Sequence, residues 1–246
     1  MTKEVLKDER KVVVITGANR GIGLATVEKF VQEGWQVCAC VRNESEQLSA
    51  LLGNQGQVYL LDLSSEQSVG ECVKEIVRSH EKIDALVNCA GVAFGALSLM
   101  TRMSDLKDVF QVNFFSQVLF TQLIAKKMMR KKSGAIVNIS STSGILADNG
   151  TLAYGCSKAA LSHATRIMAT ELGAFNIRVN AVAPARADTD MGRLMDEESA
   201  NLLDSRSSIS GEIEADDVAN LVFYLCSDGA RYLSGQIVRL DRGMPF

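Results

Sequence analysis

Short apolar runs alternate along this chain with longer stretches in which apolar residues recur every three or four positions. The short runs are rich in β-branched residues, a pattern typical of strands buried on both faces of a parallel sheet. The longer stretches have the period of helices with one apolar face. The predicted strands are 11–16, 36–41, 57–61, 83–87, 135–139, 177–182 and 236–240, and the predicted helices are 24–33, 66–79, 103–132, 152–173 and 213–226.

This alternation continues without a break in composition and predicts one α/β domain spanning residues 1–246. The expected fold is a Rossmann-like, doubly wound parallel sheet of about seven strands with helices on both faces. Ligands bind such sheets beyond the carboxyl ends of the strands. The residues that follow strand ends and should meet at that edge are Gly17, Arg42, Asp62, Asn88, Ser141 and Pro184. Segment 188–211 is expected to form a substrate lid over the same edge.

Composition narrows the function classes. The 246 residues are 47% hydrophobic and carry a formal charge of −3, which gives no reason to expect nucleic-acid binding. The polar first eleven residues contain no signal-peptide core, and the most apolar window, 85–100, is interrupted by Asn88, Gly91 and Gly95. We therefore expect no membrane span. Six cysteines without a C-x-x-C pair predict reduced thiols and a cytoplasmic protein, and two scattered histidines predict no metal site.

A glycine-rich turn joins the first strand to the first helix. Gly17 permits a tight turn, and Gly21 and Gly23 let the backbone approach a pyrophosphate at the positive end of the helix dipole. Asn19 and Ile22 belong to the same turn. Strand, glycine turn and helix form the context of a dinucleotide site, and the absence of G-K-S/T argues against a nucleoside-triphosphate loop.

The residue after the second strand indicates which dinucleotide is bound. A free ribose 2′-hydroxyl favours an acidic residue there, and a 2′-phosphate favours arginine. Here Arg42 occupies the place and Arg20 projects from the glycine turn, so NADP(H) is favoured over NAD(H). After the third strand, Asp62 could accept from the adenine amino group and Leu63 could flank the ring.

Tyr154 and Lys158 lie four residues apart in a predicted helix and should be neighbours on one face. A nearby ammonium group favours the phenolate, so the pKa of Tyr154 is expected to fall below its usual value of about 10. The small-residue turn with Ala90 and Gly91 permits close backbone approach to a ligand. Asn113, which lies amid aromatic residues in another helix, must find polar partners.

These motifs together resemble the short-chain dehydrogenase/reductase family. In chain order they are Thr16-Gly17-x-x-x-Gly21-Ile22-Gly23, Asn88-x-Ala90-Gly91, Asn113, Ser141 and Tyr154-x-x-x-Lys158. The resemblance extends from about residue 11 to residue 243 and is greatest to the 3-oxoacyl-[acyl-carrier-protein] reductase type. It implies an NAD(P)-dependent oxidoreductase that interconverts a carbonyl and a secondary alcohol of a small molecule.

The resemblance also implies roles for single residues. Tyr154 would donate and accept the proton, and Lys158 would lower its pKa and hold the nicotinamide ribose. Ser141 would orient the substrate carbonyl, and Asn113 would hold a relay water. Further cofactor contacts are implied for Asn88, Ala90, Gly91, Pro184, Ala187 and Thr189, of which Thr189 would bind the nicotinamide carboxamide. A homotetramer is implied, with the helices of Asn113 and Tyr154 and the last strand at its interfaces.

Some positions depart from the family pattern. Cys89 replaces an asparagine, Ala185 a glycine after proline, and Arg242 the first glycine of a terminal D-G-G. Arg242 would place a charge near the tetramer interface. A basic run before the fifth strand could bind an acidic acyl carrier protein, although Phe175 stands where carrier-using relatives have a second basic residue. The run comprises Lys126, Lys127, Arg130, Lys131 and Lys132, and a solvated charge run explains it equally well.

Two alternative functions remain open at this point. The first is a non-catalytic NADP-binding scaffold or sensor, against which the full set of Asn113, Ser141, Tyr154 and Lys158 argues. The second is a sugar-nucleotide-modifying enzyme, which could use the same tyrosine and lysine but has little room here for a nucleotide-sugar region.

Overall fold

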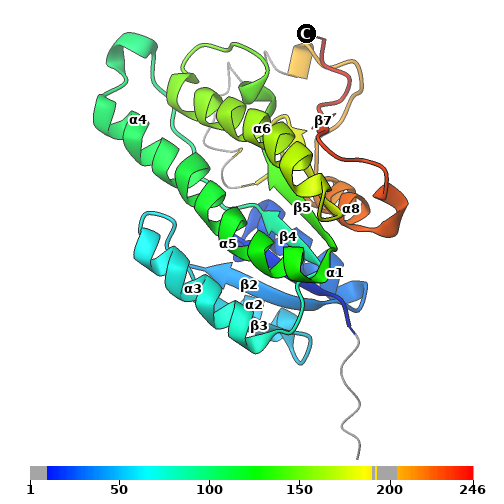
Figure 1. The fold of residues 1–246 in the computed structure, drawn as a ribbon. Helices are drawn as coiled ribbons and strands as arrows, with labels where there is room; N and C mark the ends of the chain where they lie inside the picture. The colour runs from blue at the N-terminus through cyan, green and yellow to red at the C-terminus, as the bar shows by residue number, and fades with distance from the viewer. Residues whose placement is uncertain (1–9, 190–191, 193–203, 246) are drawn as a thin grey trace, which may run out of the picture.

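Seven parallel strands form one sheet in the computed structural model, which describes residues 10–189, 192 and 204–245 (Figure 1). The strands are β1 (Val12–Thr16), β2 (Gln36–Val41), β3 (Gly56–Leu60), β4 (Ala85–Asn88), β5 (Gly134–Ile139), β6 (Ile177–Pro184) and β7 (Ile237–Leu240). Their order is β3-β2-β1-β4-β5-β6-β7, so the direction of winding reverses between β1 and β4. This is the switch point at which doubly wound sheets bind ligands, and the predicted fold class is confirmed.

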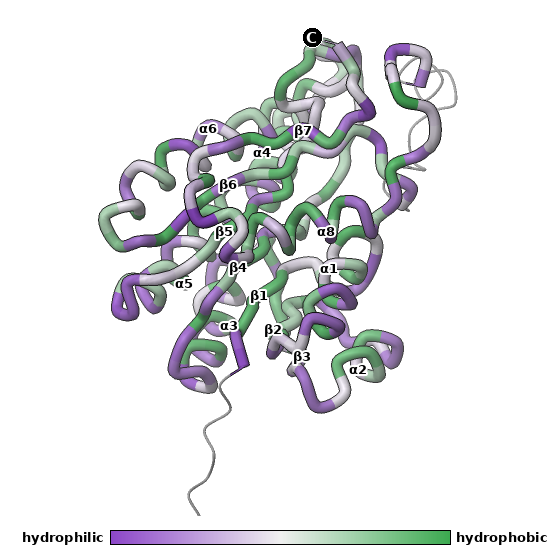
Figure 2. Tube along the Cα trace, turned by 90° about the vertical axis from the view of Figure 1, so that its right-hand side faces the viewer, coloured by the Kyte–Doolittle hydropathy of each residue, from purple (hydrophilic) through white to green (hydrophobic). Residues whose placement is uncertain are grey.

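Helices cover both faces of the sheet. Alternate residues of β1 explain why, because Val13 and Ile15 enter one apolar cluster and Val12 and Val14 the other. Helices α1 (Gly21–Gln32), α2 (Glu46–Leu52) and α8 (Ala215–Cys226) pack on the first cluster. Helices α3 (Glu66–Ser79), α5 (Ser116–Lys131) and α6 (Leu152–Gly173) pack on the second. Figure 2 shows hydrophilic stretches mainly on the outside of this three-layer arrangement.

No helix in the part of the chain that the structure describes is both long and apolar enough to cross a membrane.

Most predicted elements are found, and the differences have local causes. The predicted helix 103–132 is divided into α4 (Met103–Phe110), a π-helical turn (Gln111–Phe115) and α5. Such wide turns within helices are frequent at functional sites. The sequence analysis missed α2, because this short helix buries only Leu48 and Leu52 and so carries little apolar pattern. The predicted lid, 188–211, lies mostly outside the described residues.

A chain of buried amides and hydroxyls crosses the sheet just below the strand ends. Asn88 Nδ2 donates to Asn138 Oδ1 at 2.8 Å and to Thr121 Oγ1 at 2.7 Å. Asn138 Nδ2 donates in turn to Thr165 Oγ1 at 2.8 Å. These groups join β4 and β5 to α5 and α6, which cover the same face of the sheet. Since buried polar groups are costly without partners, the network specifies how the helices sit on the sheet.

Replacing Asn138 by alanine should lower the free energy of unfolding by roughly 2–4 kcal/mol, because the change removes the acceptor of an Asn88 N–H group and leaves a small cavity. Urea denaturation at one protein concentration measures the difference. The exposed Asn54→Ala serves as a control and should unfold at the wild-type midpoint. Equal midpoints for all three proteins would mean that the network contributes no stability.

Candidate active site

A cleft of about 1300 Å³ runs along the carboxyl ends of the strands. This volume exceeds the 300–1,000 Å³ typical of small-molecule sites, as a dinucleotide with a second ligand requires. The structure brings nearly all of the predicted site residues to its walls. They are Gly17, Asn19, Arg20, Gly21, Ile22, Gly23, Arg42, Asp62, Leu63, Ala90, Gly91, Ser141, Tyr154, Lys158, Pro184, Ala187 and Thr189.

The glycine turn is shaped by close backbone contacts. Gly17 has φ +70°, and a Cβ atom there would lie 2.7 Å from the Cα atom of Ala90. A Cβ atom on Gly23 would lie 2.0 Å from the carbonyl oxygen of Gly17. Arg20, the residue that precedes α1, makes no side-chain cap, so the first N–H groups of the helix are left for another acceptor. The turn therefore fits the pyrophosphate of a dinucleotide.

The end of the cleft beside the glycine turn, where adenosine is predicted to bind, carries two exposed arginine residues, Arg20 and Arg42. Asn19 between them is held by a 2.5 Å hydrogen bond from its Nδ2 to the Asn43 carbonyl oxygen and a 3.0 Å bond from Ser45 to its Oδ1. Asp62 accepts from the backbone N–H and the hydroxyl of Ser64, and these bonds hold the pKa of its carboxyl below the usual value. Asp62 is thus a charged acceptor at this end.

Tyr154 and Lys158 lie one helical turn apart on α6. The Lys158 ammonium nitrogen lies 5.8 Å from the centre of the Tyr154 ring and donates to the Ile139 carbonyl oxygen at 2.7 Å. Lys158 is only 3% exposed, and burial lowers its pKa to about 8. The predicted proximity of the two side chains is confirmed.

The predicted direction of the Tyr154 pKa is wrong for this structure. Burial raises the pKa of Tyr154 above its ordinary value, because a buried phenolate would lose its hydration. Interaction with the Ser141 hydroxyl lowers it, but by less. The Lys158 ammonium nitrogen lies 5.8 Å from the centre of the Tyr154 ring, and its hydrogen bond goes to the Ile139 carbonyl oxygen.

Asn113 lies beneath the cleft, fully buried in the π-helical turn. Its Oδ1 accepts from the Val92 N–H at 2.8 Å, and its Nδ2 donates to the Val92 carbonyl oxygen at 2.9 Å and to Ser157 Oγ at 3.2 Å. A Cβ atom on Gly91 would lie 3.2 Å from Asn113 Oδ1 and 3.4 Å from Lys158 Nζ. Asn113 therefore positions the loop after β4 against α6, and its predicted contact with a relay water stays a prediction.

Asn88 departs from the prediction of cofactor contact. Its side chain is fully buried and belongs to the amide network below the cleft. It is the last residue of β4, where the alternation of the strand turns its side chain to the face of the sheet that α5 covers. Any contact between this turn and a ligand would come from the residues after it, Cys89 to Gly91, which do line the cleft.

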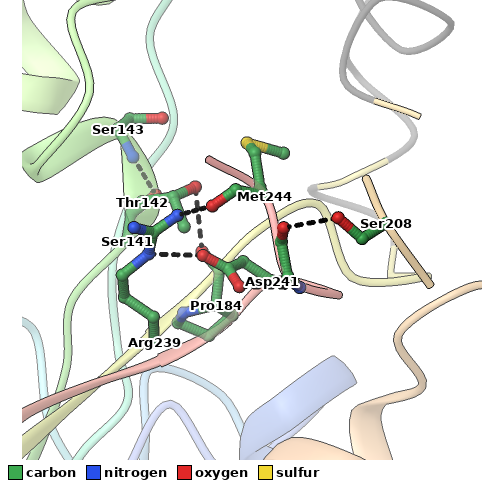
Figure 3. A network of polar contacts seen from close by, with 9 residues as sticks. Ser141, Thr142, Ser143, Pro184, Ser208, Arg239, Asp241 and Met244 are labelled. Carbon is green, nitrogen blue, oxygen red and sulfur yellow. Dashed lines mark hydrogen bonds and ion pairs between the residues drawn. The ribbon is translucent and has the colours of Figure 1, made fainter. Parts of the chain in front are cut away.

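Ser141 stands at the end of β5 beside the end of β6. Its Oγ accepts from the Ser143 N–H at 3.1 Å, and Thr142 Oγ1 donates to the Pro184 carbonyl oxygen at 3.4 Å. Figure 3 shows that the C-terminal turn lies next to these residues, where Arg239 donates to the Asp241 carboxylate and to the Met244 carbonyl oxygen. The C-terminal turn thus lies beside the end of the cleft that Ser141 lines.

Arg242 lies close to the same end of the cleft. The backbone of Arg242 is in the left-handed region, at φ +56°. Its guanidinium group donates hydrogen bonds to the Asp204 carboxylate and to the Gly211 carbonyl oxygen. The side chain is only 14% exposed. It holds the segment from Asp204 to Gly211 against the C-terminus, a role that the sequence analysis did not foresee.

Sequence reasoning assigned no role to two charged residues that line the cleft, Asp148 and Arg186. Arg206 donates to the Asp148 carboxylate at 3.1 Å. Arg186 follows the strand end at Pro184 by two residues, so the strand-end argument could have found it. Asp148 lies in an irregular loop before α6, and no periodic pattern in the sequence indicates its place.

This chain is similar to several known proteins along nearly its whole length. Residues 17–245 match the family model described as enoyl-(acyl carrier protein) reductase. The chain is 36% identical over 242 residues to the 3-oxoacyl-[acyl-carrier-protein] reductase FabG of Thermotoga maritima, an alignment that covers 96% of this chain and 98% of the relative. It is 33% identical over 245 residues to the FabG of Aquifex aeolicus, covering 97% and 99%.

Solved structures of similar fold also match nearly the whole chain. A protein described as a short chain dehydrogenase/reductase family protein is similar with a TM-score of 0.86 and 27% identity, covering 95% of this chain and 96% of that one. The structure described as ElxO with NADP bound is similar with a TM-score of 0.88 and 27% identity, covering 96% and 98%.

The low pKa of Lys158 predicts how stability changes with pH. Between the pKa of about 8 in the folded protein and the usual 10.5, the unfolded chain binds a proton that the folded protein does not. The free energy of unfolding should therefore rise with pH in this range. Relative to Lys158→Met, the wild type should gain about 1–2 kcal/mol between pH 8 and pH 9.5. Urea denaturation of both proteins at the two pH values measures this, and parallel pH profiles would contradict it.

Proposed function

The chain belongs to the short-chain dehydrogenase/reductase family, and from this premise we propose that it uses NADPH to reduce the 3-oxo group of an acyl thioester. The protein is an NAD(P)-dependent oxidoreductase that acts on carbonyl or CH–OH groups. The observation that carries the proposal is the meeting of Ser141, Tyr154 and Lys158 at one end of a cleft large enough for a dinucleotide. The substrate class is supported by the names of the FabG relatives.

The side chains at this end suit carbonyl reduction. A bound nicotinamide supplies the hydride. The hydroxyl groups of Ser141 and Tyr154 can donate to the substrate carbonyl oxygen and stabilise its developing negative charge. The phenol of Tyr154 can give up a proton, and because burial raises its pKa, the phenolate that forms needs a neighbouring positive charge to stabilise it. We assign Tyr154 as the proton donor and Ser141 as the residue that orients the carbonyl.

Lys158 and Asn113 support these groups from below. We propose that Lys158 binds the nicotinamide ribose and that its charge stabilises the phenolate left after proton transfer. With a pKa of about 8, its ammonium group stays largely protonated near neutral pH. Asn113 bonds Ser157 of α6 and the backbone of Val92 in the loop after β4, and so fixes the loop against the helix.

We propose that NADP(H) is preferred over NAD(H). Arg20 and Arg42 line the adenosine end, and the residue after β2 is basic where a 2′-hydroxyl site would carry an acid. The solved relative described with NADP bound supports the same preference.

We propose a homotetramer as the working form. Several large apolar side chains near α4 and the π-helical turn are exposed, which marks an association surface. They are Leu99, Met100, Met103 and Phe115. An acyl carrier protein remains a proposed partner for the basic end of α5, although Lys127 there already donates to the Val77 carbonyl oxygen at 3.1 Å.

We further propose that the protein works in a reducing compartment, the cytoplasm. All six cysteines are described and none forms a disulfide. Burial raises the pKa of Cys38, Cys89 and Cys226 to about 12, which keeps these thiols unreactive.

Replacing Tyr154 by phenylalanine should lower kcat by roughly 10²- to 10⁴-fold, since the variant keeps the ring but loses the proton. The Kd for NADPH should stay within about twofold of the wild-type value, because phenylalanine fills the same space. NADPH consumption with an acetoacetyl thioester measures kcat, and fluorescence titration measures Kd. The exposed Tyr224→Phe is the matched control and should behave as wild type. Wild-type turnover in Tyr154→Phe would refute the assignment.

Replacing either Arg20 or Arg42 by alanine should lower kcat/KM for NADPH by roughly 10- to 100-fold, the value of a charge-assisted phosphate contact, and leave kcat/KM for NADH nearly unchanged. Initial rates with the two cofactors measure the ratio. Arg166→Ala, on the exposed side of α6, should leave the ratio as in the wild type. An equal loss with both cofactors would show that the two arginines do not read the 2′-phosphate.

A further inference from the structure

Arg186 lies at the catalytic end of the cleft. It follows β6, whose Val182 pairs with Ile139 of β5, the strand that leads to Ser141. The 3.4 Å hydrogen bond from Thr142 to the Pro184 carbonyl oxygen joins the two strand ends. Arg186, Ser141 and Tyr154 all line the same cleft. Arg186 therefore lies on the loop after the strand that neighbours β5, in the same cleft as Ser141 and Tyr154.

Arg186 is too far from the adenosine end to serve the 2′-phosphate. Strands β1, β4 and β5 separate β6 from β2, which carries Arg42. Four strand spacings amount to roughly 19 Å. The cleft thus has a separate cationic group at each end.

The ion pairs of Arg186 are loose. Its Nη2 lies 3.7 Å from an Asp204 carboxylate oxygen and 3.6 Å from a Glu212 carboxylate oxygen, both beyond hydrogen-bond range. The Glu212 side chain is 60% exposed, so water screens much of its attraction. A guanidinium group binds a carboxylate best through two parallel N–H bonds, and neither of these contacts has that form.

Two of the described acidic residues at this end have closer partners than Arg186. Asp204 accepts a direct hydrogen bond from Arg242, and Asp148 accepts one from Arg206 at 3.1 Å. These two carboxylates are therefore largely neutralised. Among the described residues, Arg186 thus has two carboxylates at ion-pair distance but a hydrogen bond to neither, and an anionic ligand in the cleft could compete with these longer contacts.

We propose that Arg186 is a specificity-determining residue that binds a carboxylate carried by the substrate. The preferred substrates would then be oxo acids, or acyl thioesters whose acyl part ends in a carboxylate. The inference rests on the proposed carbonyl reduction and specifies that the substrate carries a carboxylate. A neutral ester of the same oxo acid would lack the charge that Arg186 recognises.

Matched acid and ester pairs test this proposal. The panel comprises 2-oxobutyrate, acetoacetate and 4-oxopentanoate, each with its methyl ester. Calorimetric titration in the presence of NADP⁺ gives Kd without turnover, and NADPH consumption gives kcat/KM. For at least one pair, the wild type should favour the acid. Arg186→Gln should then weaken acid binding and lower kcat/KM for the acid by roughly 10- to 100-fold, and change the ester by less than about twofold.

Two further variants make the test specific. Arg186→Lys keeps the charge and should recover part of the acid preference. Glu212→Gln removes the competing carboxylate and should tighten acid binding by roughly two- to threefold. Arg231→Gln, whose side chain stacks on Tyr232, is the control and should match the wild type. Thermal unfolding establishes that each variant is folded.

The possible outcomes separate the two proposals. If Arg186→Gln changed Kd and kcat/KM equally for the acid and the ester of every pair, the proposed role of Arg186 would be overturned. The same conclusion would follow if the wild type favoured the acid in none of the pairs. If Arg186→Gln raised the KM for NADPH and kept the preference for the acid, the guanidinium group would be assigned to the cofactor. That result would also overturn the proposed role of Arg186. Acid-selective binding that depends on Arg186, without NADPH consumption for any carbonyl compound, would support Arg186 and reject the reductase function.

Discussion

The buried hydrogen bond between the Lys158 ammonium group and the Ile139 carbonyl oxygen is the contact on which the rest of the site depends. An ammonium group that is 3% exposed is tolerated only with a close acceptor, and its pKa of about 8 reflects the cost of burial. The bond ties α6 to the end of β5. Tyr154, one turn earlier on α6, and Ser141, just after β5, are brought together as a consequence.

Buried polar side chains below the cleft connect the strands and helices that form it. Asn113 joins the loop after β4 to α6, and Asn88 and Asn138 join the central strands to α5 and α6. Buried networks of this kind are rigid, because every lost partner leaves an unpaired group in a medium of low dielectric constant. A rigid base suits proton transfer, which depends on hydrogen-bond distances.

The cleft carries arginines at two places, and we propose that they recognise different ligands. Arg20 and Arg42 form a cationic adenosine end, and Arg186 forms a second cationic point about four strands away. Between them, Gly17 and Gly23 keep the backbone close and free of side chains. The dinucleotide and the substrate can thus be recognised by different arginines while sharing one continuous cleft.

The sequence alone determined the fold class, most strand and helix positions and the neighbouring places of Tyr154 and Lys158, since periodicity and the spacing of a helix are local properties. The positions of Gly17, Arg42, Asp62 and Ser141 directly after predicted parallel strands implied that they would meet at one edge. Only the tertiary structure decided that Asn88 lies under the cleft, that burial raises the Tyr154 pKa, and that Arg242 binds Asp204. Desolvation and ion pairing depend on which distant segments surround a group, and no local pattern encodes those surroundings.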